Sequence, residues 1–167
     1  AGAHPPAGVD VTGAAREQLT DEKSQRHEVT LHVGTGTFRP IATDSLSEHA
    51  MHSEWARLSP DTATALTAVR SAGGRVVAVG TTSMRVLETA SGSGTLSAFE
   101  GPTDLFIHPP YQFQVVDALL TNFHLPRTTL LVLVRTFGGA SLIRRAYQLA
   151  VEGDYPFYRS GDAVRIP

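Results

Sequence analysis

The sequence contains no cysteine, and its 167 residues include no apolar run of the length needed to cross a bilayer. The first absence excludes disulfides, thiolate metal sites and cysteine nucleophiles together. Because a membrane-spanning helix needs about 20 consecutive apolar residues, the second argues against membrane insertion. A basic segment followed by an apolar one is also missing at the N-terminus, so we expect a cytoplasmic protein that is not secreted.

Lysine is almost absent, because thirteen of the fourteen basic residues are arginine. Arginine favours bidentate contacts with phosphate, although a biased codon composition produces the same usage. The net charge is -2, yet residues 124–167 carry six basic and three acidic side chains. These arginines could track phosphates if folding places them on one face. They are Arg127, Arg135, Arg144, Arg145, Arg159 and Arg165.

Composition favours one ordinary globular domain, with 41% hydrophobic and 18% charged residues. Residues 1–28 are weakly patterned, and we predict an irregular N-terminal segment with a short helix around residues 16–22. Residues 29–167 are predicted to form an α/β catalytic-type domain, with a mixed sheet and flanking helices.

Several segments predict strands. Alternating apolar residues over 29–33 indicate a half-buried strand that runs into a glycine-rich turn. Residues 75–80 predict a buried strand, and residues 91–104 a connection rich in glycine and serine. Residues 104–120 predict one strand, a turn forced by proline, and a second extended or helical piece. A closing loop and strand are expected over 154–166.

Helices are predicted from caps and apolar periodicity. Ser59 as N-cap, with Pro60 at the first helical position, predicts a helix through Val69. The capping-box spacing of Ser45 and Glu48 indicates a shorter one. Together with the strand over 75–80, the first of these helices makes an α/β unit, and ligands gather at the carboxyl ends of strands in such units. The remaining predicted helices cover residues 81–90, 127–137 and 141–151.

The turn "GTGT", from Gly34 to Thr37, is the first candidate site. Its backbone amides and two hydroxyls could bind an anion or a ribose. A tight hairpin turn explains the glycines equally well, and the pattern is not the dinucleotide-binding GxGxxG.

The segment "HAMHSEW" contains His49, His52 and Glu54. These residues could hold a metal, or His52 could transfer protons while Glu54 sets the tautomer of a histidine. A metal site needs at least one more ligand in suitable geometry, and no HExxH or comparable signature is present. An ordinary, partly exposed segment is the remaining interpretation.

Two further polar clusters flank predicted apolar segments. Thr81, Thr82 and Ser83 can cap the helix that follows them, or they can bind a ribose or a carboxylate together with Arg85. The second cluster contains Asp117, Asn122 and His124, and these side chains could satisfy buried backbone groups around a turn or contact a ligand. Spacing alone does not decide between packing and chemistry.

Taken together, the clusters resemble the S-adenosylmethionine:tRNA ribosyltransferase-isomerase family of queuosine biosynthesis. The resemblance covers most of the chain from Val29 onward, and family members are substantially longer, with an N-terminal β-rich domain that has no counterpart here. The chain therefore resembles the C-terminal half of a family member or a truncated variant. The matching segments, in order, are "VTLHVGTGTFRP", "HAMHSEW", "GGRVVAVGTTSMRVLE", "TDLFIHPPYQF", "VDALLTNFHLPRTTLLVLV" and "YPFYRSGDAVRI".

The resemblance implies an unusual use of S-adenosylmethionine, whose ribosyl part is transferred in place of its methyl group. The acceptor in this family is 7-aminomethyl-7-deazaguanine at the tRNA wobble position. Isomerisation of the ribosyl part then gives epoxyqueuosine, with release of adenine and methionine. The implied partners are thus S-adenosylmethionine and tRNA, with no metal and no membrane.

The resemblance also suggests roles for the candidate residues. His52 with Glu54, or His32, would carry the proton transfers. A non-catalytic relative that binds a nucleotide or RNA is the alternative function, and a metal-dependent hydrolase using His49, His52 and Glu54 is another. The residues expected to hold the nucleoside and methionine ends are Gly34, Thr35, Gly36, Thr37, Thr81, Thr82 and Arg85. Those expected to read the deazaguanine or orient the ribose are Asp117, Asn122 and His124.

Overall fold

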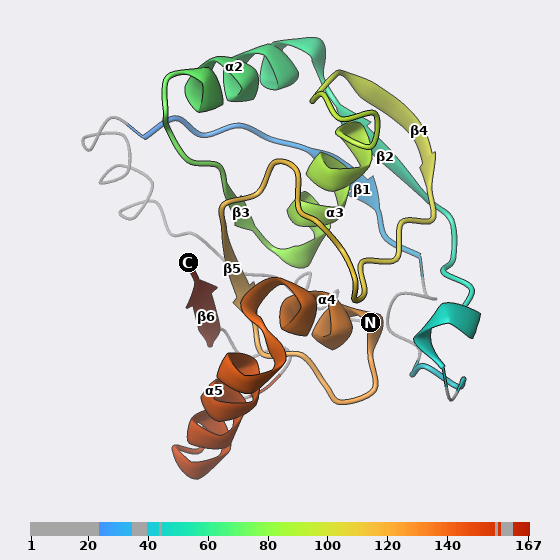
Figure 1. Ribbon diagram of the computed structural model, residues 1–167, viewed down its shortest axis with the longest axis vertical. Helices are drawn as coiled ribbons and strands as arrows, with labels where there is room; N and C mark the ends of the chain where they lie inside the picture. Colours follow the sequence, from blue (N-terminus) through green and yellow to red (C-terminus); the bar gives the residue numbers. More distant parts are fainter. Residues whose placement is uncertain (1–23, 35–39, 44, 156, 158–161) are drawn as a thin grey trace, which may run out of the picture.

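The computed structural model describes residues 24–34, 40–43, 45–155, 157 and 162–167. The short helix predicted over residues 16–22 lies outside them. In chain order (Figure 1), the elements are β1 (Thr30–His32), η2 (Leu46–Glu48), β2 (Glu54–Leu58), α2 (Pro60–Ser71), β3 (Val77–Val79), α3 (Thr81–Ala90), β4 (Phe99–Thr103), β5 (Ala118–Asn122), α4 (Thr129–Gly138), α5 (Ala140–Glu152) and β6 (Ala163–Ile166).

The strands form two small sheets with helices around them. One sheet has the antiparallel order β1-β2-β4, and the other has the order β3-β5-β6, in which β3 and β5 are parallel and β6 is antiparallel to β5. This mixed arrangement confirms the predicted α/β class. Among the described residues, no helix is both long and apolar enough to span a bilayer.

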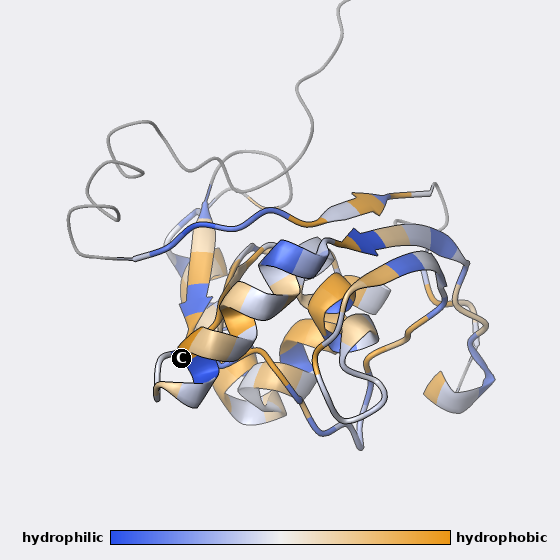
Figure 2. Cartoon of the chain, turned by 90° about the horizontal axis from the view of Figure 1, so that it is seen from above, coloured by the Kyte–Doolittle hydropathy of each residue, from blue (hydrophilic) through white to orange (hydrophobic). Residues whose placement is uncertain are grey.

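Helix α3 is the central packing element, because it contacts strands of both sheets and also α4. Met84 and Val86 of α3 are fully buried, as are Ala56 of β2 and Leu119 of β5, all in one hydrophobic cluster. Figure 2 shows the hydrophobic colour concentrated on the helices and strands in the middle of the molecule. Any side chain on the inner face of α3 is therefore shielded from water.

Helix boundaries follow from capping. The Ser59 hydroxyl accepts a hydrogen bond from the Thr62 amide at 3.2 Å, with Pro60 at the first helical position, as predicted for α2. Helix α4 begins two residues later than predicted, because Arg127 has a φ of 60° and Thr128 is the N-cap. Gly139, with a φ of 80°, ends α4 and precedes α5.

One predicted connection and one predicted strand were wrong, and the strand over residues 54–58 was not predicted. Residues 91–104 contain β4, an edge strand whose Gly101 and Pro102 read as turn residues but are tolerated at the edge of a sheet. Residues 54–58 form β2, which alternates burial through Glu54, Ala56 and Leu58 and so lacks a strongly apolar pattern. Residues 104–108 form no strand.

Strand β3 is less buried than its apolar sequence predicts. Val77 and Val79 are 49% and 39% exposed, whereas Ala78 between them is 1% exposed. The strand lies at the edge of its sheet, and its two faces have different environments. A continuous apolar run therefore did not indicate burial on both faces.

Candidate functional site

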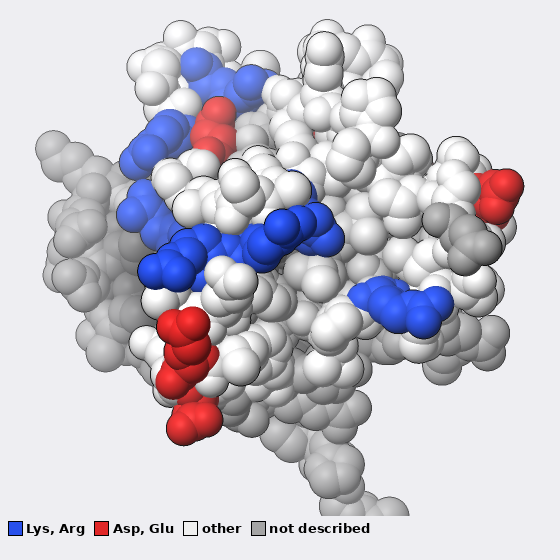
Figure 3. Space-filling model, turned by 60° about the horizontal axis from the view of Figure 1, so that its bottom comes forward, with Lys and Arg blue, Asp and Glu red and all other residues white. Residues whose placement is uncertain are grey.

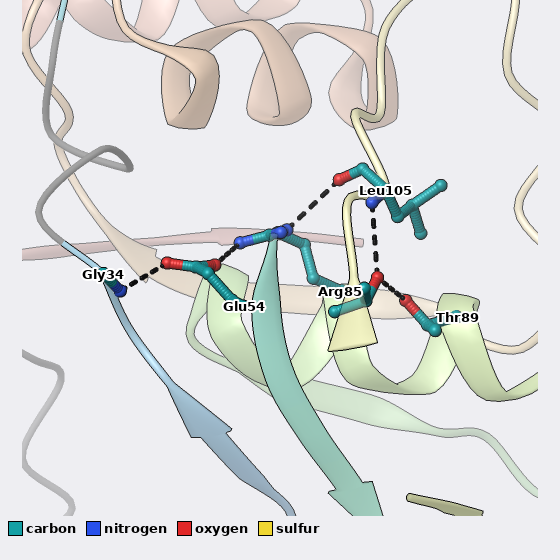
Figure 4. A network of polar contacts seen from close by, with 6 residues as sticks. Gly34, Glu54, Arg85, Thr89 and Leu105 are labelled. Atoms are coloured by element: carbon teal, nitrogen blue, oxygen red, sulfur yellow. Dashed lines mark hydrogen bonds and ion pairs between the residues drawn. The ribbon is translucent and has the colours of Figure 1, made fainter. Parts of the chain in front are cut away.

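A buried ion pair joins three of the candidate motifs. The Arg85 guanidinium on α3 donates through Nη1 to Oε2 of Glu54 at the start of β2, and the two side chains are 3% and 0% exposed. The Gly34 amide, which follows β1, donates to Oε1 of Glu54 at 2.7 Å. Figure 4 shows the carboxylate between the amide and the guanidinium. The polar residues of three separate sequence motifs thus meet at one point.

The network continues from Arg85 toward β4. The Arg85 Nε atom donates to the Leu105 carbonyl oxygen at 3.3 Å, and the Leu105 amide donates to the Thr103 hydroxyl at 3.2 Å. The Thr103 and Thr89 hydroxyls are 2.8 Å apart (Figure 4). Because Thr89 belongs to α3, the network begins and ends on that helix. This chain of contacts fixes the orientation of the Arg85 side chain.

One nitrogen of the Arg85 guanidinium has no partner in this network. Its Nη2 atom is buried and has no hydrogen-bond partner among the described residues. A buried donor without an acceptor costs about 1–3 kcal/mol, and more when it is charged. Such an atom marks a position where an acceptor on a ligand would be stabilised.

The start of α3 and the end of β5 lie at the same edge of the second sheet. Val79 of β3 is paired with Leu120 of β5, and the Gly80 amide donates to the Leu120 carbonyl oxygen at 2.8 Å. Thr121 and Asn122 therefore lie beside the N-terminus of α3. We call this edge, residues 80–82 and 121–124, the carboxyl edge.

The N-terminus of α3 has no side-chain cap. Its N-cap is Gly80, with a φ of 87°, and the Ser83 hydroxyl donates back to the Val79 carbonyl oxygen at 2.8 Å. The capping interpretation of Thr81 and Thr82 is therefore wrong, and the first amides of α3 remain available to a ligand. Thr81 is buried and Thr82 is half-buried. Arg85 is one helical turn beyond Thr81.

His124 is buried at the carboxyl edge. Its Nε2 atom lies 3.0 Å from the Thr121 hydroxyl, and its backbone amide donates to the Tyr147 hydroxyl at 2.8 Å. Burial lowers the pKa of His124 to about 4. The imidazole is therefore neutral near pH 7, where it can donate one hydrogen bond and accept another but carries no positive charge.

The pKa of His124 makes stability dependent on pH. An unfolded histidine binds a proton below about pH 6.5 whereas folded His124 does not, so stability is complete above the unfolded pKa and falls as the pH decreases toward 4. We expect the free energy of unfolding to fall by about 2 kcal/mol between pH 7.5 and pH 5 from this residue. Urea unfolding of the wild type and of His124→Gln at both pH values measures the difference. An equal pH dependence of stability in the two proteins would contradict this prediction. Exposed His27→Gln is the control and should keep the pH dependence of the wild type.

Asn122 and Asp117 have backbone partners at opposite ends of β5. Asn122 donates through Nδ2 to the Asp162 carbonyl oxygen at 3.2 Å, which links β5 to the segment before β6. Asp117 accepts from the Val76 amide at 2.8 Å. Because β5 rises about 3.3 Å per residue, Asp117 is roughly 16 Å from Asn122. The structure does not bring Asp117 to the carboxyl edge, and its expected grouping with Asn122 and His124 is corrected accordingly.

The predicted proton-transfer residues His32 and His52 lie on the surface, whereas Glu54 is buried. His32 is exposed and its ring packs on Trp55 with centroids 5.1 Å apart. Because side chains alternate along a strand, Trp55 and His32 lie on the face opposite Glu54. His52 is exposed, and the His49 ring contacts Phe106 at 5.2 Å.

The remaining predicted positions are the turn and a metal site. Thr35, Gly36 and Thr37 lie outside the described residues. Over the described ranges, no three His, Asp or Glu side chains converge as a metal site would require.

The sequence analysis missed Glu88, a carboxylate that is 1% exposed on the inner face of α3. It accepts hydrogen bonds from the amides of Gln114, Val115 and Val116 at 2.9, 3.0 and 3.1 Å, and from the Tyr111 hydroxyl at 3.2 Å. Burial, followed by the charge of Glu88, raises the pKa of Tyr111 far above its usual value. The available signal was an acidic residue on an otherwise apolar helical face.

Glu88 also borders a cavity of about 560 Å³ beside the buried network. Its lining includes three residues of that network, Thr89, Thr103 and Leu105. The cavity therefore lies beside the Glu54 and Arg85 pair, on the side of β4. Other lining residues are Asp104, Tyr111 and Gln114.

Comparison with known proteins gives consistent matches. A family model described as "Queuosine biosynthesis protein" matches residues 1–166. The S-adenosylmethionine:tRNA ribosyltransferase-isomerase of Dichelobacter nodosus is 49% identical over 166 residues, which are 99% of this chain and 47% of that protein. The protein of the same name from Ralstonia pickettii is 52% identical over 165 residues, 98% of this chain and 46% of its own length.

A solved structure agrees with these matches. The crystal structure of S-adenosylmethionine tRNA ribosyltransferase from Thermotoga maritima superposes with a TM-score of 0.78 at 40% sequence identity. The superposition covers 94% of this chain and 50% of that one. The chain thus spans about half the length of the curated relatives it matches.

Proposed function

Because the chain belongs to the queuosine biosynthesis protein family, we propose that it carries the S-adenosylmethionine site of a tRNA ribosyltransferase-isomerase. The proposed reaction transfers the ribosyl part of S-adenosylmethionine to 7-aminomethyl-7-deazaguanine at the tRNA wobble position and isomerises it. Epoxyqueuosine, adenine and methionine are the products. Relatives of this chain carry the name of that activity, which supports the proposal at the level of the family.

The observation that carries the proposal is the unsatisfied Nη2 atom of buried Arg85. S-adenosylmethionine has a carboxylate on its methionine end, and a guanidinium binds a carboxylate through charge-assisted hydrogen bonds. Glu54 already balances the charge of Arg85, so the methionine carboxylate would add a hydrogen-bond acceptor and would be further stabilised by the uncapped start of α3. We propose that Thr82, half-buried at the start of α3, contacts the ribose.

We propose that Glu54 also positions the groups around it. Its carboxylate is held between the Gly34 amide and Arg85, so it orients the turn after β1 and the guanidinium. His52 with Glu54 stays the proposed pair for abstracting the proton next to the sulfonium and for assisting the departure of adenine, and His32, on the sheet face opposite Glu54, stays the alternative.

Thr82→Ala is expected to weaken binding of S-adenosylmethionine about fivefold, because it removes one hydrogen bond worth about 1 kcal/mol. Isothermal titration calorimetry with this chain measures the change. Ser83→Ala is the matched control, because the Ser83 hydroxyl is already engaged with the Val79 carbonyl oxygen. Equal affinities for the Thr82 and Ser83 variants would place the nucleoside elsewhere.

Adenine release is the test of the whole proposal. We expect release only when a tRNA that carries the deazaguanine base is present, as detected by chromatography of the reaction. Adenine release without that tRNA, or methyl transfer in place of ribosyl transfer, would contradict the proposed reaction. Binding of S-adenosylmethionine with no adenine release under any condition would favour the non-catalytic alternative for this chain.

A further inference from the structure

We propose that a groove between α4 and α5 binds the phosphate backbone of the tRNA, an inference that rests on the proposed function. The groove has a volume of about 410 Å³, and its polar lining comprises Arg135, Arg144, Gln148, Tyr147 and Glu152. We call it the α4–α5 groove. Arg144, Gln148 and Glu152 follow one another at intervals of four residues, so they form one stripe along α5.

Five arginines of the C-terminal stretch are exposed and lack acidic partners among the described residues, and two of them, Arg135 and Arg144, line the groove. Arg127, Arg135, Arg144, Arg145 and Arg165 are all exposed, and none of them has a carboxylate within 4.0 Å among the described residues. Figure 3 shows arginine side chains gathered on the face that carries α4 and α5. The locally basic C-terminal stretch of the sequence thus becomes a basic surface.

Two arginines elsewhere on the surface, Arg57 and Arg26, have acidic partners, whereas exposed Arg70 and Arg75 have none among the described residues. Arg57 lies 3.5 Å from Glu100, and Arg26 lies 3.4 Å from Glu28. Their charges are partly neutralised within the chain, whereas those of the groove are available to an external anion. A polyanion gains from such a surface because each phosphate contact releases counterions.

Most of the groove's wall is apolar, and it is the two arginines on that wall that favour RNA over an apolar protein partner. Leu131, Ile143 and Val151 contribute apolar surface to the lining. An apolar partner covering them would also bury Arg135 and Arg144 without counter-charges, which is unfavourable. Phosphates would pair with both guanidinium groups in bidentate geometry while sugar edges contact the apolar floor.

The groove is also connected to the proposed nucleoside site. Tyr147, which lines the groove, accepts a hydrogen bond from the backbone amide of His124 at 2.8 Å. His124 belongs to the carboxyl edge, where α3 presents its uncapped amides. RNA held in the groove would therefore lie beside the ribosyl donor.

The test compares two double variants with the same loss of charge. Arg135→Gln with Arg144→Gln removes the groove arginines, and Arg57→Gln with Arg70→Gln removes two exposed arginines on β2 and α2, elements away from α5 in Figure 1. Fluorescence anisotropy measures the affinity of each protein for a labelled tRNA between about 50 and 200 mM salt. The groove variant is expected to bind at least about tenfold more weakly, with a salt dependence shallower by about 2 in log-log slope.

Calorimetry with S-adenosylmethionine separates this inference from the proposed function. We expect both double variants to keep the wild-type affinity for it. Equal tRNA affinity in the two double variants, or no tRNA binding by the wild-type chain, overturns the groove assignment while leaving the nucleoside site intact. Groove-dependent tRNA binding without any S-adenosylmethionine binding would instead support the groove and overturn the proposed function.

Discussion

Arg85→Met is expected to lower the free energy of unfolding by roughly 3–5 kcal/mol and to abolish measurable binding of S-adenosylmethionine. The stability effect follows because the variant leaves the Glu54 carboxylate buried without its counter-charge. The binding effect follows because the variant removes the unsatisfied Nη2 donor. Urea unfolding and calorimetry measure the two effects separately.

A double variant separates structure from ligand binding. Glu54→Gln together with Arg85→Met removes both charges, and we expect it to recover much of the stability lost in the single variant. Binding should not recover, because the guanidinium remains absent. Recovery of binding in the double variant would show that Arg85 acts only through the ion pair and not on the ligand.

Glu88→Ala is expected to destabilise the chain by about 3 kcal/mol or more. Three backbone amides of residues 114–116 and the Tyr111 hydroxyl lose their shared acceptor, and a buried donor without a partner costs about 1–3 kcal/mol. Urea unfolding measures the loss. The loop from Tyr111 to Val116, which lies between α3 and β5, should show increased hydrogen exchange at these amides.

Conservative and surface variants provide the controls for Glu88. Glu88→Gln keeps one acceptor oxygen and should cost less than Glu88→Ala. Exposed Glu100→Gln should change stability by no more than about 0.5 kcal/mol. If Glu88→Ala and Glu100→Gln have equal effects, the buried carboxylate does not organise the loop.

Glu88 and Glu54 show how far local patterns reach in this chain. Helix α3 is evident from its sequence, and so is the cap of α2 at Ser59, because these features depend on residues within a few positions of one another. The burial of a carboxylate depends on segments far away in the chain. Glu54 is 31 residues from Arg85, and Glu88 is 28 residues from Val116.

The errors in the strand predictions have a similar origin. Strand β2 has alanine and glutamate on its buried face, and β4 contains glycine and proline. Their pairing with each other stabilises both, although neither sequence has a strong intrinsic preference for a strand. Strand β3 has that preference, yet Val77 and Val79 on one of its faces are exposed, whereas Ala78 on the other face is buried.

The sequence by itself determined the α/β class, the main helices, the family resemblance and the identity of the motifs that carry polar residues. Only the tertiary structure decided which of those residues meet. It joined Gly34, Glu54 and Arg85 in one buried network and placed Asp117 at the far end of its strand. The physical reason is that helix caps and periodicity are local, whereas ion pairing, desolvation and strand pairing depend on which distant segments pack together.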